Sequence, residues 1–349
     1  MSDLSITLLE WYDRNKRDLP WRKSEDPYRV WVSEIMLQQT RVEAVVAKYL
    51  AFIAAFPTVE SLAQAEENAV MTLWQGLGYY RRAHNLWNAA KILCQEYQGE
   101  FPTDYAMFLG LPGVGEYTAN AVFSIVYQEP RVAMDGNLLR VAARLKVEHG
   151  SISQMPVKKG LGRYLALRLA VNRPGDFNQA LMDLASSVCV PKKPRCLKCP
   201  IRSYCLGYAL GVAHTLPVKK GITNVSIVPV SIFWCENQAK QILLRRRKKG
   251  GFLQGLWELP WEEQNPTATV AEAVANYGRT EPEVFHHTYT FSHKQWLMSI
   301  RRQMVDESIR LDFRNGEDVE YSWVAFEQLA DYPMSTVFRE VINLKVLVS

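Results

Sequence analysis

Four of the six cysteines lie in one short segment, at the positions Cys189, Cys196, Cys199 and Cys205, with six, two and five residues between neighbours. Thiolates gathered this closely either hold a soft metal centre or form disulfides. A structural zinc site usually takes two separated C-x-x-C pairs, and this segment contains one such pair. The spacing alone therefore leaves an iron–sulfur cluster and a zinc site as alternatives.

Two carboxylates stand in surroundings that suit them to different acid–base roles. Glu34 is flanked by apolar residues such as Trp31 and Ile35, which can raise its pKa enough to keep a proton near neutral pH. Asp135 precedes a helical run at 138–145, and the positive end of a helix keeps a carboxylate ionised. Taken alone, the two residues would be interpreted as a half-buried structural glutamate and a helix cap.

The segment LPGVGEYTANAVFSIV at 111–126 contains two glycines, Gly113 and Gly115, between two helical patterns, and Tyr117 opens the second. Glycine lets the backbone come close to a ligand, and N–H groups at the start of a helix attract phosphate. The segment therefore suits a phosphate backbone, although an ordinary turn between two helices would have the same sequence features.

The hairpin, an aspartate about twenty residues later and the cysteine spacing together resemble the endonuclease III superfamily of DNA base-excision glycosylases. Four blocks are similar to the MutY family of adenine DNA glycosylases within it: LPWR at 19–22, VWVSEIMLQQTRV at 30–42, GLGYYRRAHNL at 76–86 and MDGN at 134–137. The blocks follow the family order and cover most of the first 205 residues. The resemblance implies a [4Fe–4S] cluster rather than zinc.

The resemblance also implies roles for the two carboxylates, because cleaving an N-glycosidic bond requires one acid and one ionised carboxylate. Glu34 would protonate adenine at ring nitrogen 7 and then activate water, and Asp135 would stabilise the anomeric carbon. Lyases of the superfamily carry a nucleophilic lysine where this sequence has Tyr117, and Leu139 supplies no amine either. We therefore expect a monofunctional glycosylase that leaves an abasic site.

A base inside a duplex must be extruded before these groups can reach it. By match to the family, the residues that would line the adenine pocket are Arg17, Trp21, Arg22, Leu37, Val42, Tyr117 and Gln179. Those that would contact DNA or the lesion are Gln39, Thr40, Leu77, Tyr79, Gly113 and Gly115, with Gln39 and Tyr79 wedged near the opposite base. An aromatic residue in GLGYY would otherwise be expected in the core. The resemblance also suggests a monovalent cation at the hairpin.

These residues need a helical framework. Across residues 11–206 the apolar side chains recur at helical spacing, and one long helix is expected to follow Pro27 and to end before Pro57. The resemblance implies that residues 1–205 form a mainly α-helical helix–hairpin–helix glycosylase domain with an iron–sulfur cluster loop.

Beyond a linker expected at 206–224, the pattern changes to that of an α+β domain at 225–349. Alternating and β-branched runs predict strands at 225–235 and 241–247 and a hairpin at 286–305. The segment TATVAEAVANYG predicts one helix there.

Residues 250–260, GGFLQGLWELP, resemble the first half of a Nudix signature, but no R-E-x-x-E-E cluster follows to hold magnesium. The MutY family implies a Nudix-like domain that recognises the lesion through a Phe-Ser-His loop, present here as Phe291, Ser292 and His293. The serine would accept the N–H at nitrogen 7 of 8-oxoguanine, although a plain hairpin turn also uses serine. The basic run at 245–249 is either a DNA-facing loop or solvated surface.

Length and composition indicate two folded domains and exclude wholesale disorder, since 349 residues include 48% hydrophobic and 22% charged side chains. No apolar run approaches the roughly 20 residues of a membrane-spanning helix, and the N-terminus lacks a signal-peptide pattern. We expect a cytoplasmic monomer, at the nucleoid in a bacterium, with reduced thiols.

The net charge of +5 is too small to indicate a partner by itself. Residues 151–220, however, carry twelve Lys and Arg against two Asp and Glu, and they include the cysteine segment. The expected partner is double-stranded DNA with an 8-oxoguanine·A or G·A pair. A G·T mismatch glycosylase and an inactive DNA-structure-binding protein are the alternatives. The Phe-Ser-His loop argues against the first, and the two carboxylates argue against the second.

Overall fold

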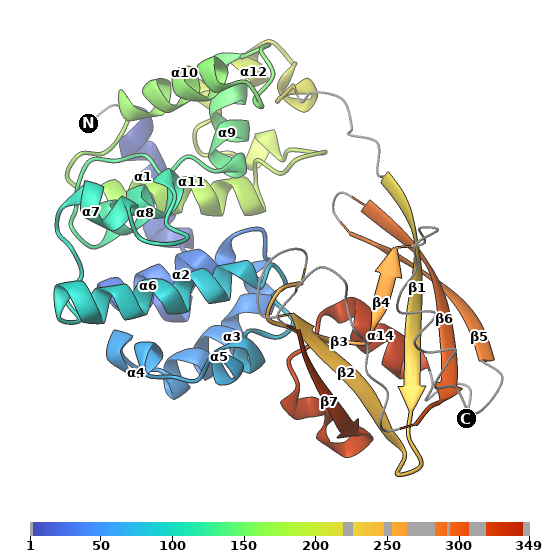
Figure 1. The fold of residues 1–349 in the computed structure, drawn as a ribbon. Helices are drawn as coiled ribbons and strands as arrows, with labels where there is room; N and C mark the ends of the chain where they lie inside the picture. The colour runs from blue at the N-terminus through green and yellow to red at the C-terminus, as the bar shows by residue number, and fades with distance from the viewer. Residues whose placement is uncertain are drawn as a thin grey trace. The chain divides into compact units, whose positions relative to one another are not determined.

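The computed structural model describes residues 3–218, 226–247, 253–263, 283–291, 294–306 and 319–344. The chain divides into two compact units, Met1–Ala65 with Asn85–Gly221 and Glu66–His84 with Ile222–Ser349. Figure 1 shows helices in the first part of the chain and a sheet in the second. Within the described ranges, no helix has both the length and the apolar character that crossing a membrane requires.

The prediction of a mainly helical first part is confirmed. Its helices are α1 (Asp3–Asn15), α2 (Pro27–Leu37), α3 (Val42–Ala55), α4 (Val59–Ala63), α5 (Glu67–Trp74), α6 (Arg81–Tyr97), α7 (Tyr105–Leu109), α8 (Glu116–Ile125), α9 (Gly136–Lys146), α10 (Met155–Ala166), α11 (Pro174–Ser187) and α12 (Leu206–Ala209). Short 3₁₀ helices are η1 (Pro20–Arg22), η2 (Cys196–Lys198), η3 (Arg202–Tyr204) and η4 (Ala213–Thr215).

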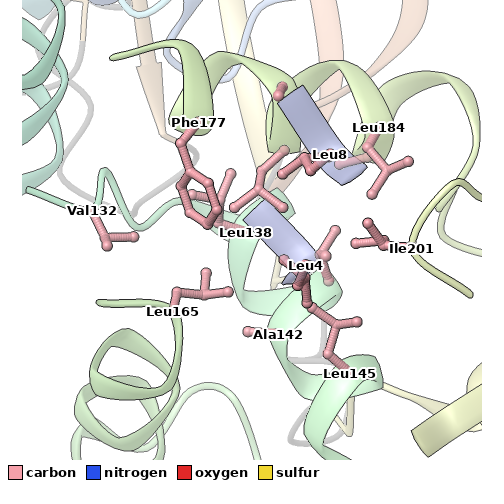
Figure 2. Packing of buried hydrophobic residues seen from close by; sticks show 14 of the residues in the cluster. Leu4, Leu8, Val132, Leu138, Ala142, Leu145, Leu165, Phe177, Leu184 and Ile201 are labelled. Carbon is pink, nitrogen blue, oxygen red and sulfur yellow. The ribbon is translucent and has the colours of Figure 1, made fainter. Parts of the chain in front are cut away.

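One hydrophobic core of the first unit joins α1, α9, α10 and α11 (Figure 2). Leu4 and Leu8 of α1 pack with Phe177 of α11 and with Ile201 from the loop that carries the cysteines. Burial of such side chains excludes water and holds the helices together. This core therefore fixes the cysteine loop, defined here as residues 189–205, against the helix that begins after Asp135.

The single long helix expected between Pro27 and Pro57 is wrong, because the segment forms two helices, α2 and α3. Gln38 leaves the helical conformation, and Gln39 adopts a left-handed backbone with φ 56°. The side-chain amide of Gln38 donates a hydrogen bond to Thr118 Oγ1 at 3.0 Å. The break contains neither glycine nor proline, so local sequence gives no sign of it.

The second part of the chain contains a sheet, as predicted. Its strands are β1 (Ser226–Glu236), β2 (Gln241–Arg247), β3 (Trp257–Glu258), β4 (Trp261–Glu263), β5 (Glu283–Thr290), β6 (Lys294–Met304) and β7 (Val319–Ala325), followed by η5 (Phe326–Asp331) and α14 (Thr336–Leu344). The order is β3-β2-β1-β6-β5, with β1 and β6 parallel, β4 paired with β1 and β7 with β2. The predicted strands and the β5–β6 hairpin are confirmed, whereas the helix predicted at 267–278 lies outside the described residues.

Both interpretations of the basic run at 245–249 are wrong for its three arginines, which the structure describes. The Arg245 side chain is 4% exposed and forms an ion pair with the buried Glu258 at 3.0 Å. Arg247 pairs with the same carboxylate at 3.2 Å, and Arg246 pairs with Glu320 at 2.6 Å. Because these strand residues find internal partners, they are neither a DNA-facing loop nor a solvated surface. The last two residues of the run lie outside the described ranges.

Candidate active site and cysteine loop

Glu34 lies in α2 with only 5% of its surface exposed. The hydroxyl of Tyr117, in the first turn of α8, donates a hydrogen bond to Glu34 Oε2 at 2.7 Å. Burial raises the pKa of Glu34 to about 7, although this hydrogen bond and the charge of Arg22 both oppose the rise. This is the direction that its apolar sequence neighbours predict. Near neutral pH the carboxyl group can therefore both give and take a proton.

Asp135 is the N-cap of α9. Its carboxylate accepts hydrogen bonds from the backbone N–H groups of Asn137 and Leu138, at 2.9 and 2.7 Å, and from the Asn137 side chain at 2.7 Å. These bonds favour the ion, as expected for a helix start. Burial outweighs them, however, so the pKa of Asp135 lies above its ordinary value. The negative charge of Asp135 in turn helps to raise the pKa of Glu34.

A cavity of about 430 Å³ adjoins Glu34, which forms part of its wall. Six residues predicted for the adenine pocket also line it: Arg17, Trp21, Arg22, Leu37, Val42 and Gln179. Tyr117 and Asp135 are not among the lining residues, and Tyr117 reaches the site through its hydrogen bond to Glu34. The volume falls in the range of small-molecule sites. Six of the seven residues predicted for the pocket therefore lie around one cavity beside an acid.

The polar wall of this cavity is held by two groups that sequence reasoning missed. Asp183 of α11 accepts hydrogen bonds from both Arg17 and Arg22. Tyr12 of α1 donates from its hydroxyl to Gln179 Oε1 at 3.0 Å, and burial raises the pKa of Tyr12 to about 12, so it stays neutral. The sequence did contain an indication of Asp183. It lies four residues after Gln179, which is predicted for the pocket, and residues four apart share one face of a helix. No comparable signal pointed to Tyr12.

Gln39 and Thr40 occupy the break between α2 and α3. Gln39 is exposed and has a left-handed backbone, whereas Thr40 is half-buried. A left-handed residue other than glycine is strained unless its surroundings hold it, and such residues gather at functional sites. The hydrogen bond from Gln38 to Thr118 supplies that support. The exposed position suits the predicted contact with a base stack.

Tyr79, in the second unit, is 49% exposed and also has a left-handed backbone, with φ 48°. Arg82 donates to the carbonyl oxygens of Leu77 and Gly78, each at 3.0 Å, and its guanidinium lies 5.6 Å from the centre of the Tyr79 ring. Tyr79 is therefore presented to solvent instead of packing into a core. Leu77, predicted as a DNA contact, is buried, with 5% of its surface exposed.

The glycine turn connects α7 to α8. Gly113 has φ 78°, and a Cβ atom there would lie 2.7 Å from the Asn85 Cβ. Gly115 caps α8 with an ordinary φ of −101° and open space around it. Gly113 is thus required by backbone conformation and packing, whereas Gly115 leaves the start of α8 accessible. This geometry suits the expected approach of a phosphate.

Of the predicted lesion-reading loop, only Phe291 lies within the described residues, and Ser292 and His293 fall outside them. The Phe291 ring packs against Tyr289 and Trp296, with centroids 4.7 and 5.1 Å away. Phe291 therefore anchors the end of β5 to the core of the sheet.

The four cysteines of the loop are all half-buried, and three of them pack against the core of the first unit. Burial, together with the charges of the other three thiols, raises the pKa of Cys199 to about 12. Arg144, fully buried in α9, donates to Cys189 Sγ at 3.3 Å and to the carbonyl oxygens of Val190 and Pro191. Across the described residues, no group of three His, Cys, Asp or Glu is arranged to hold a metal ion.

Comparisons with known proteins show to which family the chain belongs. Residues 32–166 match the HhH-GPD superfamily of base excision DNA repair proteins, and residues 231–344 match the NUDIX domain. The adenine DNA glycosylase of Arabidopsis thaliana is 36% identical over 78% of this chain, which spans 50% of that relative's length. The adenine DNA glycosylase of Mus musculus is 40% identical over 97% of this chain and 76% of its own. The chain belongs to the adenine DNA glycosylase family.

Membership of the adenine DNA glycosylase family confirms the resemblance found in the sequence, together with the helical domain and the Nudix-like α+β domain that it implied. A thermostable thymine-DNA glycosylase has a similar structure, with a TM-score of 0.53 and 27% identity over 59% of this chain and 95% of its own.

Proposed function

We propose that the protein is a monofunctional DNA glycosylase that removes adenine paired with 8-oxoguanine or guanine and leaves an abasic site. The observation that carries the proposal is the buried Glu34, held by Tyr117 beside a cavity, in a chain of the adenine DNA glycosylase family. Six of the seven residues that the family match assigns to the adenine pocket line this cavity.

In the proposed reaction, the bond between C1′ and nitrogen 9 of adenine breaks, and its electron pair leaves with the base. Protonated Glu34 gives its proton to nitrogen 7, which makes adenine a better leaving group. Asp135, close enough to act electrostatically on Glu34, stabilises the positive charge that develops at C1′. The Glu34 carboxylate then takes a proton from water as the oxygen bonds to C1′, which regenerates the acid.

The absence of a lyase step follows from the side chains at the hairpin. A lyase needs an amine that attacks C1′ to form a Schiff base. The position next to Glu34 holds the phenol of Tyr117, whose pKa burial raises well above its ordinary value, so the group remains a neutral donor. We therefore infer hydrolysis that ends at the abasic site.

We further propose that the cysteine loop holds a [4Fe–4S] cluster through Cys189, Cys196, Cys199 and Cys205. The donor set fits in kind, because four thiols from one loop lie within electrostatic reach of one another and three of them pack against the core. Hydrogen bonds from protein donors to cluster sulfurs are a usual feature of such sites, and Arg144 already donates to Cys189 Sγ. When bound, the cluster would supply rigidity and a redox-capable centre.

Double-stranded DNA is the proposed partner. The excess of twelve Lys and Arg over two Asp and Glu at residues 151–220 supports phosphate binding by the first unit. For the lesion, we propose that Ser292 accepts the N–H of 8-oxoguanine. The variant Ser292→Ala should lose this hydrogen bond, which is worth about 1 kcal/mol, and so lower the preference for 8-oxoguanine·A over G·A. Guanine does not make this hydrogen bond, so adenine release from G·A should stay within about threefold of normal.

The direct test is a single-turnover assay on duplexes that carry 8-oxoguanine·A, G·A, G·T or only normal pairs. We expect adenine release from the first two, and at least ~100-fold slower release by Glu34→Gln, because general acid catalysis contributes that much or more. Asp135→Asn should be impaired as strongly. Failure to release adenine from 8-oxoguanine·A would refute the proposal, and thymine release from G·T alone would establish the alternative substrate.

A further inference from the structure

Asp183 does not itself line the cavity, but it pairs with Arg17 and Arg22, which do. The residue is buried, with 2% of its surface exposed. Arg22 reaches it with both terminal nitrogens, Nη1 to Oδ2 at 2.8 Å and Nη2 to Oδ1 at 3.0 Å. Arg17 donates from Nε to Oδ1 at 2.7 Å and from its backbone N–H to Oδ2 at 3.3 Å. Two guanidinium groups of the cavity wall thus share one buried carboxylate.

This arrangement sets both the geometry and the charge of the wall. A guanidinium fork on a carboxylate has little rotational freedom, so each arginine is held in one orientation. Two positive charges and one negative charge leave one net positive charge beside the cavity. The side chains of Asp183 and Arg22 are 3% and 12% exposed, so their charges act on neighbours with less screening than at a surface, whereas Arg17 is 34% exposed.

Glu34 is the neighbour that matters for chemistry. The charged and titratable groups that act on it are Tyr117 of α8, Asp135 at the start of α9 and Arg22 of η1. Asp135 and burial favour the protonated acid, whereas Arg22 favours the carboxylate. A second uncompensated arginine in the wall would shift this balance further towards the carboxylate.

We propose that Asp183 is a positioning residue for base removal, which fixes Arg17 and Arg22 in the cavity wall and cancels one of their two charges, so that Glu34 can act as an acid near neutral pH. The proposal rests on the proposed glycosylase function. It assigns to α11 a role in setting the protonation state of a residue on α2 without touching the base.

The test variant is Asp183→Asn, which keeps the shape of the side chain and removes its charge. Loss of the charge stabilises the Glu34 carboxylate, so the alkaline limb of the single-turnover pH–rate profile should move to lower pH. We expect a rate on 8-oxoguanine·A about tenfold below normal at pH 8 and within about threefold of normal at pH 6, as a shift of about one pKa unit requires. A purely structural role would lower the rate by one factor at every pH.

Two further variants separate charge from shape. Asp183→Glu keeps the charge and displaces it, so it should slow the reaction while leaving the alkaline limb in place. The double variant Asp183→Asn with Arg17→Gln restores one net positive charge and should return the limb towards its normal position. An unmoved limb in Asp183→Asn, or a double variant with the same limb as that single variant, would overturn the proposal.

A second readout does not depend on turnover. The titration of the Glu34 carboxyl can be followed by infrared difference spectroscopy, with Glu34→Gln to identify its band. Its midpoint should fall in Asp183→Asn and not in Asp183→Glu. If the wild-type protein released no adenine, the proposed function would be refuted. The titration of Glu34 would still show whether Asp183 controls its protonation. Circular dichroism and affinity for abasic duplex would show that each variant is folded.

Discussion

At the scale of single residues, the site combines three acidic groups in one desolvated space. Burial raises the pKa of Glu34, Tyr117 and Asp135 alike, and the charge of Asp135 raises the pKa of both Glu34 and Tyr117 further. Such a cluster favours states in which few of its members are ionised. The site is therefore suited to deliver a proton, at the expense of stability when it is deprotonated.

The stability of the fold should report this directly. The pKa of Glu34 is raised from 4.5 to about 7, so protonation is favoured in the folded chain and stability is lost as pH rises through about 7. Between pH 5 and pH 8 the free energy of unfolding should decrease by up to about 3 kcal/mol from this group. Glu34→Gln should remove most of that dependence and be more stable than the wild type at pH 8. Urea unfolding at both pH values measures the free energy of unfolding of each protein. Equal pH dependence in the wild type and in Glu34→Gln would contradict the prediction.

The variant Tyr117→Phe tests the hydrogen bond that Tyr117 donates to Glu34. The lost hydrogen bond favoured the Glu34 carboxylate, so its removal should raise the pKa of Glu34 and move the alkaline limb of the pH–rate profile to higher pH. The same change also removes the bond that holds the Glu34 side chain in place. The maximal rate should therefore fall about tenfold, which corresponds to the loss of a hydrogen bond worth about 1.4 kcal/mol. Single-turnover rates across pH give both quantities. A limb that moved to lower pH would show that the phenol acts in some other way.

At the scale of elements, regular parts of the fold could be predicted and irregular parts could not. Helical spacing identified the first part of the chain as mainly helical, and alternating runs identified β1, β2 and the β5–β6 hairpin, because those patterns record which face is buried. The break at Gln39 gave no local signal, since the amide of Gln38 is held by Thr118, a residue distant in sequence. For the same reason, the partners of Arg245 and Arg247 could not be found from the basic run itself.

The same division applies to the candidate site. Six of the seven residues predicted for the adenine pocket lie around one cavity, although they come from separate parts of the sequence. Tyr12 and Asp183 were missed because they act through other side chains and carry no motif of their own. The helix spacing from Gln179 indicates Asp183 only once Gln179 is assigned to the pocket, whereas Tyr12 required the structure.

The hairpin offers a matched pair of glycines for testing an element. Gly113→Ala forces a Cβ onto a left-handed backbone and to within 2.7 Å of the Asn85 Cβ, so the free energy of unfolding should fall by about 2 kcal/mol or more. Gly115→Ala adds a Cβ in open space at an ordinary φ and should leave stability within about 0.5 kcal/mol. Denaturant melts of both variants give these values.

Measurements of DNA affinity distinguish a role of the glycine turn in binding from a purely structural role. If the backbone at the start of α8 approaches a phosphate, Gly115→Ala should weaken binding to abasic duplex although the fold is intact. Unchanged affinity in Gly115→Ala would limit the turn to a structural role. Gly113→Ala alone cannot distinguish these cases, because its fold is disturbed.

At the scale of the whole molecule, the cysteine loop is joined to the catalytic part through one helix. Asp135 caps the first turn of α9, and Arg144, two turns further on, donates to Cys189 and to the backbone of the loop. A helix is a stiff connection over this length. Anything that loosens the loop is therefore expected to loosen the start of α9 as well.

Removing one ligand tests both the cofactor and this connection. We expect the wild type to be yellow-brown with about four irons per chain, as a [4Fe–4S] cluster requires. Cys199→Ser should lose most of the iron and the colour and should melt at a lower temperature, whereas Cys94→Ser, outside the loop, should keep all three. Metal analysis and thermal unfolding are the measurements. A colourless wild type that contains zinc would contradict the cluster.

The shared carboxylate in the sheet also bears on how the chain should respond to salt. Glu258 engages Arg245 and Arg247, and Glu320 engages Arg246, so two carboxylates offset two of the three positive charges. These arginines should therefore add little to the slope of the logarithm of affinity against the logarithm of salt concentration. Exposed cations without such carboxylate partners, such as Lys192 and Lys193 of the cysteine loop, should contribute more to that slope.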